Sequence, residues 1–445
     1  MLSRGGGGGT EREECVRVLV TGATGLIGSA VVARLISEGH EVVGVARSLR
    51  RATRRLPEVE WVGRDIGATT SPEAWLPHLH GVHAVVNCAG ILQDGPGAST
   101  HGVHMAGADA LFAACEQARV RRVVHLSAIG VDRETPSEFS RTKLQGDKAL
   151  AGRDLDWVIL RPSVVVGRPA YGGSAMFRGL AALPVLPLMP GTGRLQIVQL
   201  DDLVATVCFF LREDAPARLT LELAGPEPLS FPEVIRSYRS WLGWRPQREL
   251  PLPSPLAAAL YRLGDFAGRL GWRPPMRSTA GREIVRGAVG DPSEWSRVTG
   301  IVPKPLAAAL AAEPASVQER WFANLYFLKP LVFVIIAAFW ILTGLISLGP
   351  GNAIGIGLMQ EGGAGFLSAP SVLAGALADI AIGLAIAFRR TARIGIYAAL
   401  AISIFYMVAG TLILPRLWIE PLGPILKIFP IFALHLVALA ILEDR

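Results

Sequence analysis

The sequence has few cysteines, few charges for its length, and no run of basic residues that alternates with aromatic ones. Its four cysteines share no CxxC spacing and lie mostly in apolar surroundings, which is typical of free thiols in a reducing compartment; they are Cys15, Cys88, Cys115 and Cys208. Charged residues make up 18% of the 445 residues and the net charge of +7 is spread along the chain, so no nucleic-acid partner is expected. Glycines fill Gly5–Gly9 where a signal peptide would have an apolar segment, so residues 1–14 are expected to form a short flexible tail.

What the sequence does have is an excess of apolar residues, 51% of the total, concentrated toward the C-terminus. From Lys329 to Arg445 there are only 7 basic and 5 acidic residues. Four apolar stretches lie there, each close to the ~20 residues that cross the hydrocarbon core of a bilayer; they are residues 331–348, 371–388, 394–414 and 425–442. The composition therefore predicts an all-α transmembrane domain of four helices, with the lipid bilayer as a partner.

The basic residues of this region predict its orientation. The loop at 349–370 carries Glu361 as its one charged residue, whereas most basic residues fall on the other side: Lys329, Arg389, Arg390, Arg393 and Arg445. This bias predicts a multi-pass plasma (inner) membrane protein with both termini in the cytoplasm, although Arg416 and Lys427 oppose it.

Two ionisable residues, Asp379 and His435, lie inside the second and fourth spans at depths that differ by less than about one helical turn. Because charge in a bilayer is costly, one interpretation is a proton or quinone site at which the two side chains meet. The other is a structural hydrogen bond or a helix face exposed to water.

A strand, a glycine turn and a helix occur in order near the N-terminus. The apolar run 16–20 is typical of a buried strand, and Thr21-Gly22-Ala23-Thr24-Gly25-Leu26-Ile27-Gly28 follows it directly, before a helical pattern. In such a loop Gly22 permits a tight turn, Gly25 lets the backbone approach a pyrophosphate, and Gly28 lets the helix pack closely on the strand. Residues 22–27 would then hold the phosphates of a dinucleotide at the helix N-terminus.

The second expected strand, 41–46, ends in Arg47 where an Asp or Glu would bind the ribose 2′-hydroxyl of NAD. A guanidinium at this position favours the 2′-phosphate of NADP, so NADP is the expected cofactor, with NAD possible. A solvated basic loop is the alternative, since four more arginines follow between Arg50 and Arg55.

Further apolar runs predict strands that alternate with helical stretches at 107–118 and 142–150; the strands are expected at 61–62, 84–87, 123–126, 157–160 and 219–223. Alternation of this kind predicts an α/β fold with a doubly wound parallel sheet, and ligands at the carboxyl ends of its strands.

Several motifs in this order resemble the extended and atypical members of the short-chain dehydrogenase/reductase superfamily, over about residues 16–310. The motifs are the glycine loop, Arg64-Asp65-Ile66, Asn87-Cys88-Ala89-Gly90, His125-Leu126-Ser127-Ala128, Arg161-Pro162-Ser163 and the structural segment Gln199-Leu200-Asp201-Asp202-Leu203. The resemblance implies that Asp65 and Ile66 bind the adenine and that Ala89 and Gly90 lie against the cofactor. It also implies that Ser127 is the catalytic serine and that Pro162 and Ser163 lie beside the nicotinamide.

The active-site pattern of the family is incomplete. Its general acid/base is a Tyr four residues before a Lys, and here Lys143 is present but Phe139 occupies the tyrosine position. Losing a positioned acid/base typically costs about 10²- to 10⁴-fold in rate, so chemistry by the usual route is in doubt although cofactor binding is not. Lys143 would still bind ribose hydroxyls, and Ser127 would still donate a hydrogen bond.

Other residues are candidates for the missing proton donor. His104 falls where related enzymes carry an Asn near the nicotinamide, and an imidazole titrates near neutrality; a packed or solvent-facing helix residue is the alternative. Tyr171 lies in the loop that shapes the substrate pocket of relatives. His101 and His104 form an HxxH pair, but no Cys or carboxylate cluster completes it, so no metal is expected.

The expected domains are the Rossmann domain at 15–225, a small substrate-side subdomain at 226–320 and the membrane domain at 321–445. The subdomain, with helical patterns at 231–242 and 256–270, resembles that of the nucleotide-binding accessory subunit of respiratory complex I. Its tryptophans suit an apolar substrate pocket, a membrane surface or ordinary packing: Trp241, Trp244, Trp272 and Trp295. The four-span region resembles the DoxX-like membrane family, some members of which are associated with quinone-linked redox chemistry.

Together these features predict a membrane-anchored, NADP-preferring oxidoreductase acting on an apolar substrate such as a quinone or a lipid-like carbonyl. Phe139 supports the alternative, a non-catalytic nucleotide-binding scaffold or redox sensor of a membrane protein complex. Epimerase or dehydratase chemistry on a sugar nucleotide is a third hypothesis, and the missing tyrosine weakens it as well.

Overall fold

A computed structural model describes residues 15–443, so the tail expected at 1–14 lies outside the described residues. The chain forms two compact units, each of which is discontinuous in sequence. The first comprises Met1–Phe177, Pro184–Tyr261 and Pro275–Ala315, and the second Arg178–Leu183, Arg262–Pro274 and Ser316–Arg445.

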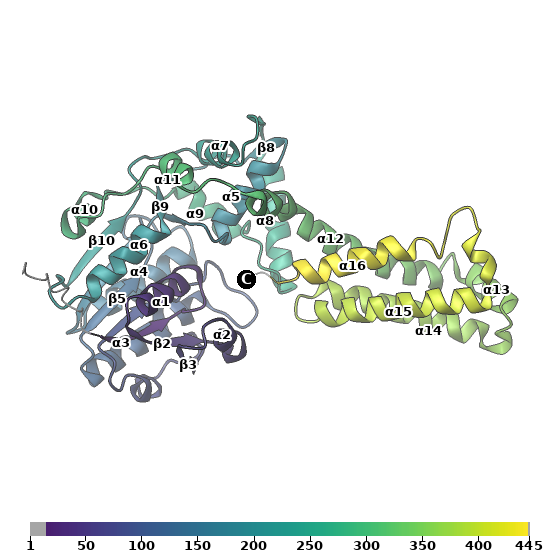
Figure 1. Ribbon diagram of the computed structural model, residues 1–445, viewed down its shortest axis with the longest axis horizontal. Coiled ribbons are helices and arrows are strands. Elements are labelled where there is room, and N and C mark those ends of the chain that lie inside the picture. The colour runs from purple at the N-terminus through teal and green to yellow at the C-terminus, as the bar shows by residue number, and fades with distance from the viewer. Residues whose placement is uncertain (1–14, 444–445) are drawn as a thin grey trace, which may run out of the picture. The chain divides into compact units, whose positions relative to one another are not determined.

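The first unit is built on a seven-stranded parallel sheet in the order β10-β6-β5-β4-β1-β2-β3 (Figure 1). Its strands are β1 (Arg17–Thr21), β2 (Glu41–Ala46), β3 (Glu60–Gly63), β4 (Ala84–Asn87), β5 (Arg122–Leu126), β6 (Asp156–Pro162) and β10 (Leu219–Leu223). Because β1 pairs with both β2 and β4, the connections leave it in opposite directions. This is the topological switch of a doubly wound fold, beside which such folds bind ligands. The expected fold class is confirmed.

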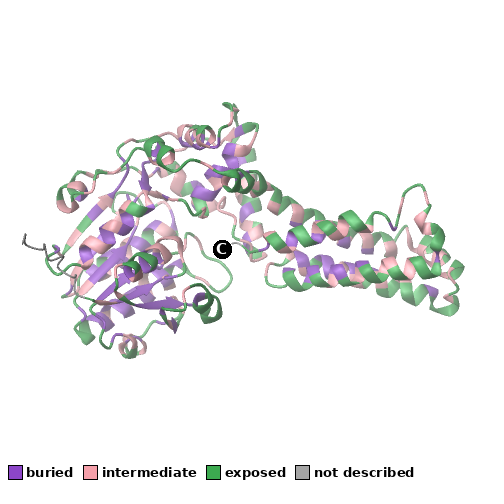
Figure 2. Ribbon diagram, viewed as in Figure 1, coloured by how far each residue is buried: buried purple, intermediate pink, exposed green. Residues whose placement is uncertain are grey.

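Helices cover both faces of this sheet, which is why its strands are nearly continuous apolar runs. On one face α1 (Leu26–Ser37) and α6 (Leu200–Leu211) bury residues against Val18 and Val20. On the other face α3 (Gly107–Ala118) and α4 (Glu138–Ala151) pack around Leu19, since successive strand residues point to opposite sides. Figure 2 shows this buried layer running through the sheet.

Shorter elements complete the first unit and its boundary segments. Two small parallel pairs join β7 (Val164–Val166) to β9 (Ile197–Gln199) and β8 (Val185–Leu188) to β11 (Arg248–Pro251). The helical patterns expected at 231–242 and 256–270 are confirmed as α7 (Phe231–Trp241) and α8 (Ser254–Arg269). The remaining helices are α2 (Leu49–Arg55), α5 (Gly172–Ala182), α9 (Ser278–Arg286), α10 (Ser293–Thr299) and α11 (Leu306–Ala312).

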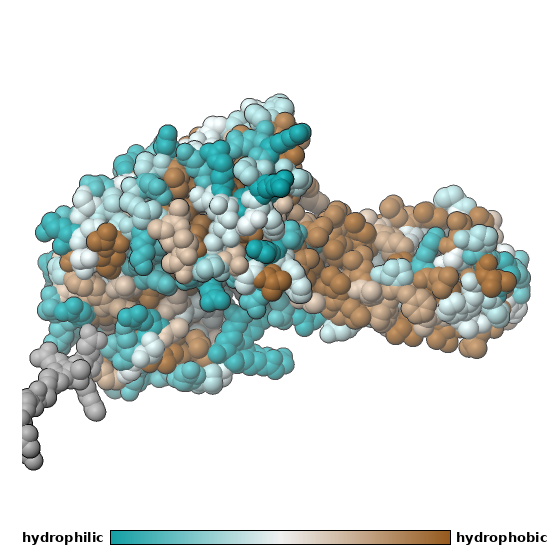
Figure 3. All heavy atoms as spheres, turned by 45° about the horizontal axis from the view of Figure 1, so that its top comes forward, coloured by the Kyte–Doolittle hydropathy of each residue, from teal (hydrophilic) through white to brown (hydrophobic). Residues whose placement is uncertain are grey.

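The second unit is a helical bundle, and the face of it that Figure 3 shows is largely apolar. Its helices are α12 (Val317–Leu348), α13 (Asn352–Glu361), α14 (Ser368–Ala387), α15 (Ala392–Ile413) and α16 (Ile428–Ile441). Among the described residues three helices are long and apolar enough to cross a membrane, Val317–Leu348, Gly365–Ala387 and Ala392–Ile413.

The bundle differs from the sequence expectation in three places. Helix α12 begins at Val317 rather than at 331, because the Ser316 and Glu319 side chains cap its first turn reciprocally and the helix continues through Pro330. The expected loop at 349–370 contains α13 and a short 3₁₀ turn at Gly365–Leu367. Helix α16 has only 14 residues, shorter than the expected fourth span, since Gly423 with φ +55° and Pro424 keep the preceding segment in turns.

Small residues set the close packing of α12 on α14. A Cβ at Gly344 would lie 2.5 Å from the Ala376 carbonyl oxygen, and one at Gly383 would lie 2.8 Å from that of Ala337. Such glycines let membrane helices approach backbone to backbone. The C-terminal ends of α14 and α16 are also joined, because Arg389, just past α14, donates a hydrogen bond to the carbonyl of Leu442, just past α16, at 2.9 Å.

The ionisable residues inside the bundle have separate partners. The Tyr406 hydroxyl donates to Asp379 Oδ1 at 3.0 Å, and Trp340 Nε1 donates to His435 Nε2 at 2.9 Å. Both Asp379 and His435 are buried. The contact between them that their depths suggested is replaced by these two pairs.

Candidate nucleotide-binding and active site

The glycine loop connects β1 to α1 at the carboxyl edge of the sheet. Gly22 has φ +63°, and a Cβ there would lie 2.8 Å from the carbonyl carbon and oxygen of Cys88 and 2.9 Å from the Ala89 nitrogen. A Cβ at Gly28 would lie 2.3 Å from the Gly22 carbonyl oxygen. The loop after β1 and the turn after β4 therefore touch through backbone alone, which requires glycine at Gly22.

The loop has the features of a phosphate site. Gly25 is the N-cap of α1 and supplies no side-chain hydrogen bond, and the first helical bond runs from Ser29 N to the Gly25 carbonyl. The amides of Leu26 and Ile27 thus lie in the first turn, where backbone donors have no partner inside the helix. Ala23 is buried and Thr24 is exposed beside them. These residues fit a pyrophosphate at the positive end of the helix.

Two arginines lie next to each other at the carboxyl edge of the sheet, one directly after β2 and one directly after β3. Arg47 follows β2 and is exposed, and no ion pair joins it to any residue of the described part of the chain. Ala46 pairs with Gly63 in register, so Arg64 follows β3 at the same edge, its amide donating to the Ala46 carbonyl at 3.2 Å. Arg64 is a candidate that the sequence interpretation did not single out, since its position beside Arg47 depends on strand register.

Asp65 is turned into its own loop, where Oδ1 accepts a hydrogen bond from the Gly67 amide at 3.1 Å. The next residue, Ile66, is buried. A hollow of about 330 Å³ is lined by Asp65, Gly67 and Val103 among others. The space beside Asp65 is compatible with the adenine role implied by the resemblance.

Lys143 lies at the centre of the site. Its Nζ donates to the Leu126 carbonyl at 2.6 Å and is 3.5 Å from the Ala89 carbonyl. A Cβ at Gly90 would lie 3.4 Å from that Nζ, so the absent side chain leaves room beside the amine. Burial lowers the pKa of Lys143 to about 8, partly offset by Asp147 and Cys88, so most of the amine is protonated at neutral pH. The structure thus brings Lys143 together with Ala89 and Gly90.

Phe139 lies one helical turn before Lys143 on α4, and its ring contacts His104. The contact is edge to face, with ring centroids 5.5 Å apart. His104 is buried in a π-helical turn, Gly102–Ala106, where Nε2 accepts from the Ile91 amide at 3.1 Å. Its Nδ1 lies 2.9 Å from the Thr142 hydroxyl, whose own proton goes to the Glu138 carbonyl at 2.7 Å.

These partners assign the proton of His104 to Nδ1, because an amide can only donate to Nε2. Burial, with the nearby Lys143 and His125, lowers the pKa of His104 well below its ordinary value. Both ring nitrogens are therefore engaged and the ring is neutral. Through these two contacts the ring links the turn after β4 to α4.

A chain of buried polar groups runs across three neighbouring strands. The Thr21 hydroxyl donates to Asn87 Oδ1 at 2.6 Å, and Asn87 Nδ2 lies 3.0 Å from His125 Nδ1. The other ring nitrogen of His125 is 3.5 Å from Asp147 Oδ1, and Arg161 donates to Asp147 Oδ2 at 3.0 Å. Asp147 is not among the residues predicted from the sequence, although it follows Lys143 by one helical turn on α4.

Ser127 lies at the end of this chain. Burial favours a neutral Asp147, but His125, Ser127 and Arg161 outweigh it and lower the pKa of that carboxyl. The Ser127 hydroxyl is buried and forms no well-oriented hydrogen bond within residues 15–443. It is thus close to a carboxylate and still able to donate to another acceptor.

The other candidates lie at the edge of this site or outside it. Pro162 ends β6, whereas the Ser163 hydroxyl donates to the Gln196 carbonyl at 2.6 Å. Tyr171 precedes α5, where its carbonyl accepts from Ser174, and His101 is exposed. Within residues 15–443 no group of three or more His, Cys, Asp or Glu residues lies together as a metal site.

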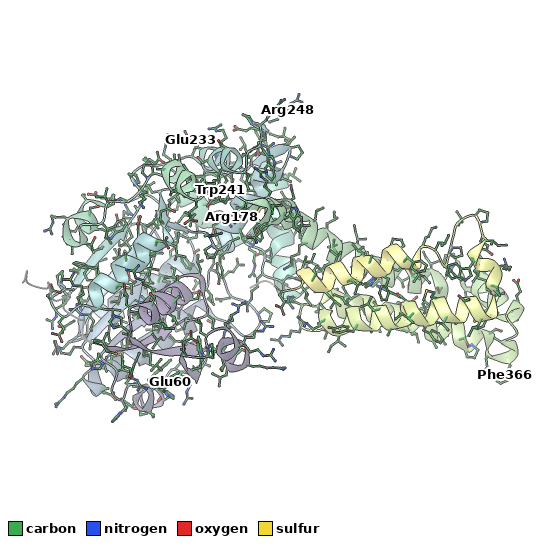
Figure 4. The ribbon with its side chains drawn as sticks, viewed as in Figure 1. Glu60, Arg178, Glu233, Trp241, Arg248 and Phe366 are labelled. Carbon is green, nitrogen blue, oxygen red and sulfur yellow. The ribbon has the colours of Figure 1, made fainter. Side chains whose placement is uncertain are left out.

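The tryptophans have three kinds of environment. Trp295 is fully buried and donates to the Thr206 hydroxyl at 2.8 Å, which is ordinary core packing. Trp241, which is labelled in Figure 4, lies on α7 and donates to the Glu313 carbonyl at 2.6 Å, and Arg239 lies over the Trp244 ring. Trp272 belongs to the second unit.

Two family models match the chain, one described as NAD(P)H-binding over residues 22–180 and one described as DoxX-like family over residues 337–436. Ceramide reductase of Caulobacter vibrioides is 27% identical over 54% of this chain and 74% of its own length. Sterol demethylase protein B of Methylococcus capsulatus is 26% identical over 68% and 98%. The mitochondrial NADH dehydrogenase (ubiquinone) 1 alpha subcomplex subunit 9 of Arabidopsis thaliana is 25% identical over 60% and 67%.

The solved structures share the fold. That of the Bordetella bronchiseptica enzyme WbmG in complex with NAD has a TM-score of 0.52 and 17% identity, covering 68% of this chain and 95% of that one. The expected relationship to the complex I subunit and the expected DoxX-like domain are confirmed. The chain is therefore an NAD(P)-binding, oxidoreductase-like protein in which a Rossmann domain related to that complex I subunit is fused to a C-terminal DoxX-like domain with membrane-length helices.

Proposed function

We propose that the protein is a membrane-anchored reductase that uses NADPH in preference to NADH and acts on an apolar carbonyl compound or quinone that partitions into the bilayer. The observation that carries the proposal is the convergence of Lys143, Ser127 and the Gly90 turn at the carboxyl edge that also holds the glycine loop. Two relatives support a lipid substrate, since their names are ceramide reductase and sterol demethylase protein B.

Ser127 and Lys143 would have separate roles in the reduction of the substrate. Bound NADPH supplies a hydride, and the reduced oxygen also needs a proton. The Ser127 hydroxyl would donate a hydrogen bond to the substrate oxygen as negative charge develops on it. The Lys143 ammonium, held by the Leu126 carbonyl, would bind the ribose and supply the proton directly or through a water, in place of the phenol that Phe139 lacks.

Arg47 and Arg64 support NADPH over NADH. Both follow strands that end at the same edge, and a 2′-phosphate between them would accept charge-assisted hydrogen bonds from two guanidinium groups. A carboxylate, which would repel that phosphate, is absent from the end of β2.

We further propose that both ends of the chain lie in the cytoplasm of a plasma (inner) membrane. The hydrogen bond from Arg389 to the Leu442 carbonyl brings the chain end to the same side as the end of α14. The arginines beside α14 and α15 would then face the side that basic residues prefer.

The second candidate is a nucleotide-binding scaffold or redox sensor without turnover. It is favoured by Phe139 and by His104, whose two ring nitrogens are both engaged within the fold. Under this hypothesis the same residues bind the dinucleotide but no substrate oxygen is reduced.

One experiment separates the two. The whole purified chain in lipid nanodiscs is titrated with NADPH and NADH, and absorbance at the nicotinamide band is followed with long-chain ketones and quinones. The reductase proposal predicts NADPH-dependent loss of absorbance with at least one acceptor. Tight nucleotide binding with no turnover on any acceptor contradicts it and leaves the scaffold.

Phe139→Tyr sharpens the result, because the tyrosine would lie one turn from Lys143 as in the family. We expect kcat to rise by roughly 10²- to 10⁴-fold, whereas the matched control Phe139→Leu should not raise it. Activity that appears only in Phe139→Tyr would show that the native site binds the nucleotide but lacks the proton donor that turnover needs.

A further inference from the structure

The second unit includes the C-terminal half of α8, whose first half belongs to the first unit. The segment Arg262–Pro274 joins the membrane helices in one compact unit. Its attachment is made by Trp272 and the backbone of Leu270. The Trp272 indole donates to the Ala387 carbonyl at the end of α14 at 2.8 Å, and the Leu270 carbonyl accepts from the Arg389 amide at 3.0 Å.

These contacts fix the depth of the segment. The Trp272 ring packs on Phe333 of α12 with centroids 4.8 Å apart, and the Arg389 guanidinium lies over the same ring. Ala387 ends α14, and Arg389 also caps the Leu442 carbonyl past α16. Trp272 thus lies where two apolar helices end, which is the level of the membrane–water interface, and tryptophan is enriched at that level.

The helix that leads into Trp272 has an uncovered apolar face. Leu263 and Phe266, three residues apart, are 63% and 54% exposed. Gly264 and Gly268, four residues apart, are buried on the inward side. The apolar side chains therefore point away from the protein while the small residues pack against it.

Basic residues border that face. Arg262 and Arg269, two turns apart along α8, are both exposed. Their long side chains would reach the phosphate level while the neighbouring Leu263 and Phe266 lie deeper. An apolar face with arginines at its edge is typical of a helix that lies in the plane of a membrane surface.

We propose that the C-terminal half of α8, from Arg262 to Arg269, lies in the cytoplasm-facing headgroup layer of the same bilayer that the bundle spans, with Leu263 and Phe266 inserted among the acyl chains and Arg262 and Arg269 on lipid phosphates. The occupant of the exposed face is lipid, because the segment is hydrogen-bonded to the end of α14 and to Arg389, which also binds the Leu442 carbonyl past α16. This inference does not depend on the proposed catalytic function.

A photo-crosslinking experiment tests it. p-Benzoylphenylalanine is placed at Leu263, at Phe266 and, as a water-exposed control, at Arg297 on α10. The whole chain is then reconstituted in vesicles of phosphatidylcholine with about 30% phosphatidylglycerol, because an anionic surface attracts basic residues. We expect the mass of one phospholipid to be added at Leu263 and Phe266 at least about fivefold more often than at Arg297.

A second arm tests the arginines. Arg262→Glu with Arg269→Glu should lower the lipid adduct at Phe266 severalfold in anionic vesicles and less in pure phosphatidylcholine, since the attraction is electrostatic. Lipid adducts at Leu263 and Phe266 no more frequent than at Arg297 would overturn the proposal. Adducts to a second copy of the chain would overturn it too, because the face would then be a protein interface.

Discussion

Replacing Gly22 by alanine tests the central geometric claim of the nucleotide site. The residue has φ +63°, a backbone conformation that costs an L-residue roughly 1–2 kcal/mol. Its new Cβ would also lie 2.8 Å from Cys88 backbone atoms, which cannot rotate away. Overpacking of this kind costs about 1–3 kcal/mol. The two effects together give about 2–5 kcal/mol.

Gly39→Ala is the matched control. Gly39 has φ +86°, but a Cβ there meets no heavy atom within 4 Å, so this variant carries the backbone strain without the collision. It lies in the turn between α1 and β2, away from the loop that would hold the phosphates. The difference between the two variants therefore isolates the contact of Gly22 with the turn after β4.

The measurements are the melting temperature and the NADPH dissociation constant of each variant. If the loop shifts to relieve the collision, NADPH binding should weaken by about tenfold or more, because each 1.4 kcal/mol is tenfold in affinity. If the loop does not shift, Gly22→Ala should melt well below Gly39→Ala. Wild-type NADPH affinity together with equal melting of the two variants would refute the reasoning.

Three further predictions concern other parts of the molecule. Arg47→Asp and Arg64→Asp should each weaken NADPH binding by roughly 10- to 100-fold, because a hydrogen bond to a charged group contributes ~1.5–3 kcal/mol. NADH binding should change little in these variants, and NADPH binding should change little in the control Arg54→Asp. Equal losses for both nucleotides would exclude contact of the arginines with the 2′-phosphate. Burial lowers the pKa of Lys143 from 10.5 to about 8. Between these two pH values the unfolded chain binds more protons than the folded chain, so the stability of the fold rises with pH. The destabilising effect of the lysine is therefore complete below about pH 8 and fades toward pH 10.5. The melting temperature of the wild type minus that of Lys143→Met should therefore rise from pH 7 to pH 10, and a flat difference would show that the folded chain does not bury the charged amine. In the bundle, a double-mutant cycle of Tyr406→Phe and Asp379→Ala should give a coupling of about 0.6–1.7 kcal/mol, and zero coupling would show that the hydrogen bond does not form in the bilayer.

Apolar runs were sufficient to predict the central sheet, since strands covered on both faces are nearly continuous in Val, Ile and Leu. The strand expected at 84–87 has those bounds, and the one expected at 157–160 extends to Asp156–Pro162. The pairs β7–β9 and β8–β11 escaped prediction because three or four residues carry no usable periodicity. Helix α12 starts earlier than hydropathy suggested because its N-terminal end is fixed by the Ser316–Glu319 capping box and not by lipid.

Some residues of the nucleotide site could likewise be predicted from the sequence and others could not. Gly22 and Lys143 belong to motifs whose spacing is local, and their positions at the sheet edge followed from the sequence. Arg64 and Asp147 become candidates only through strand register and the packing of α4 beside His125 of β5, which juxtapose residues distant in sequence. The neutral state of His104 depends on the Ile91 amide and the Thr142 hydroxyl, neither of which its own sequence neighbourhood reveals.

The two compact units are interleaved, so the polypeptide passes from one to the other five times. This sets an order of assembly during synthesis. When the ribosome has finished Pro274, the Phe333 ring and the Ala387 carbonyl that hold Trp272 do not yet exist. At ~5–20 residues per second, the remaining chain takes on the order of 10–30 s to complete. The end of α8 therefore reaches its final packing only after the membrane helices are made, and a chain shortened at Ala315 would leave Trp272 without them.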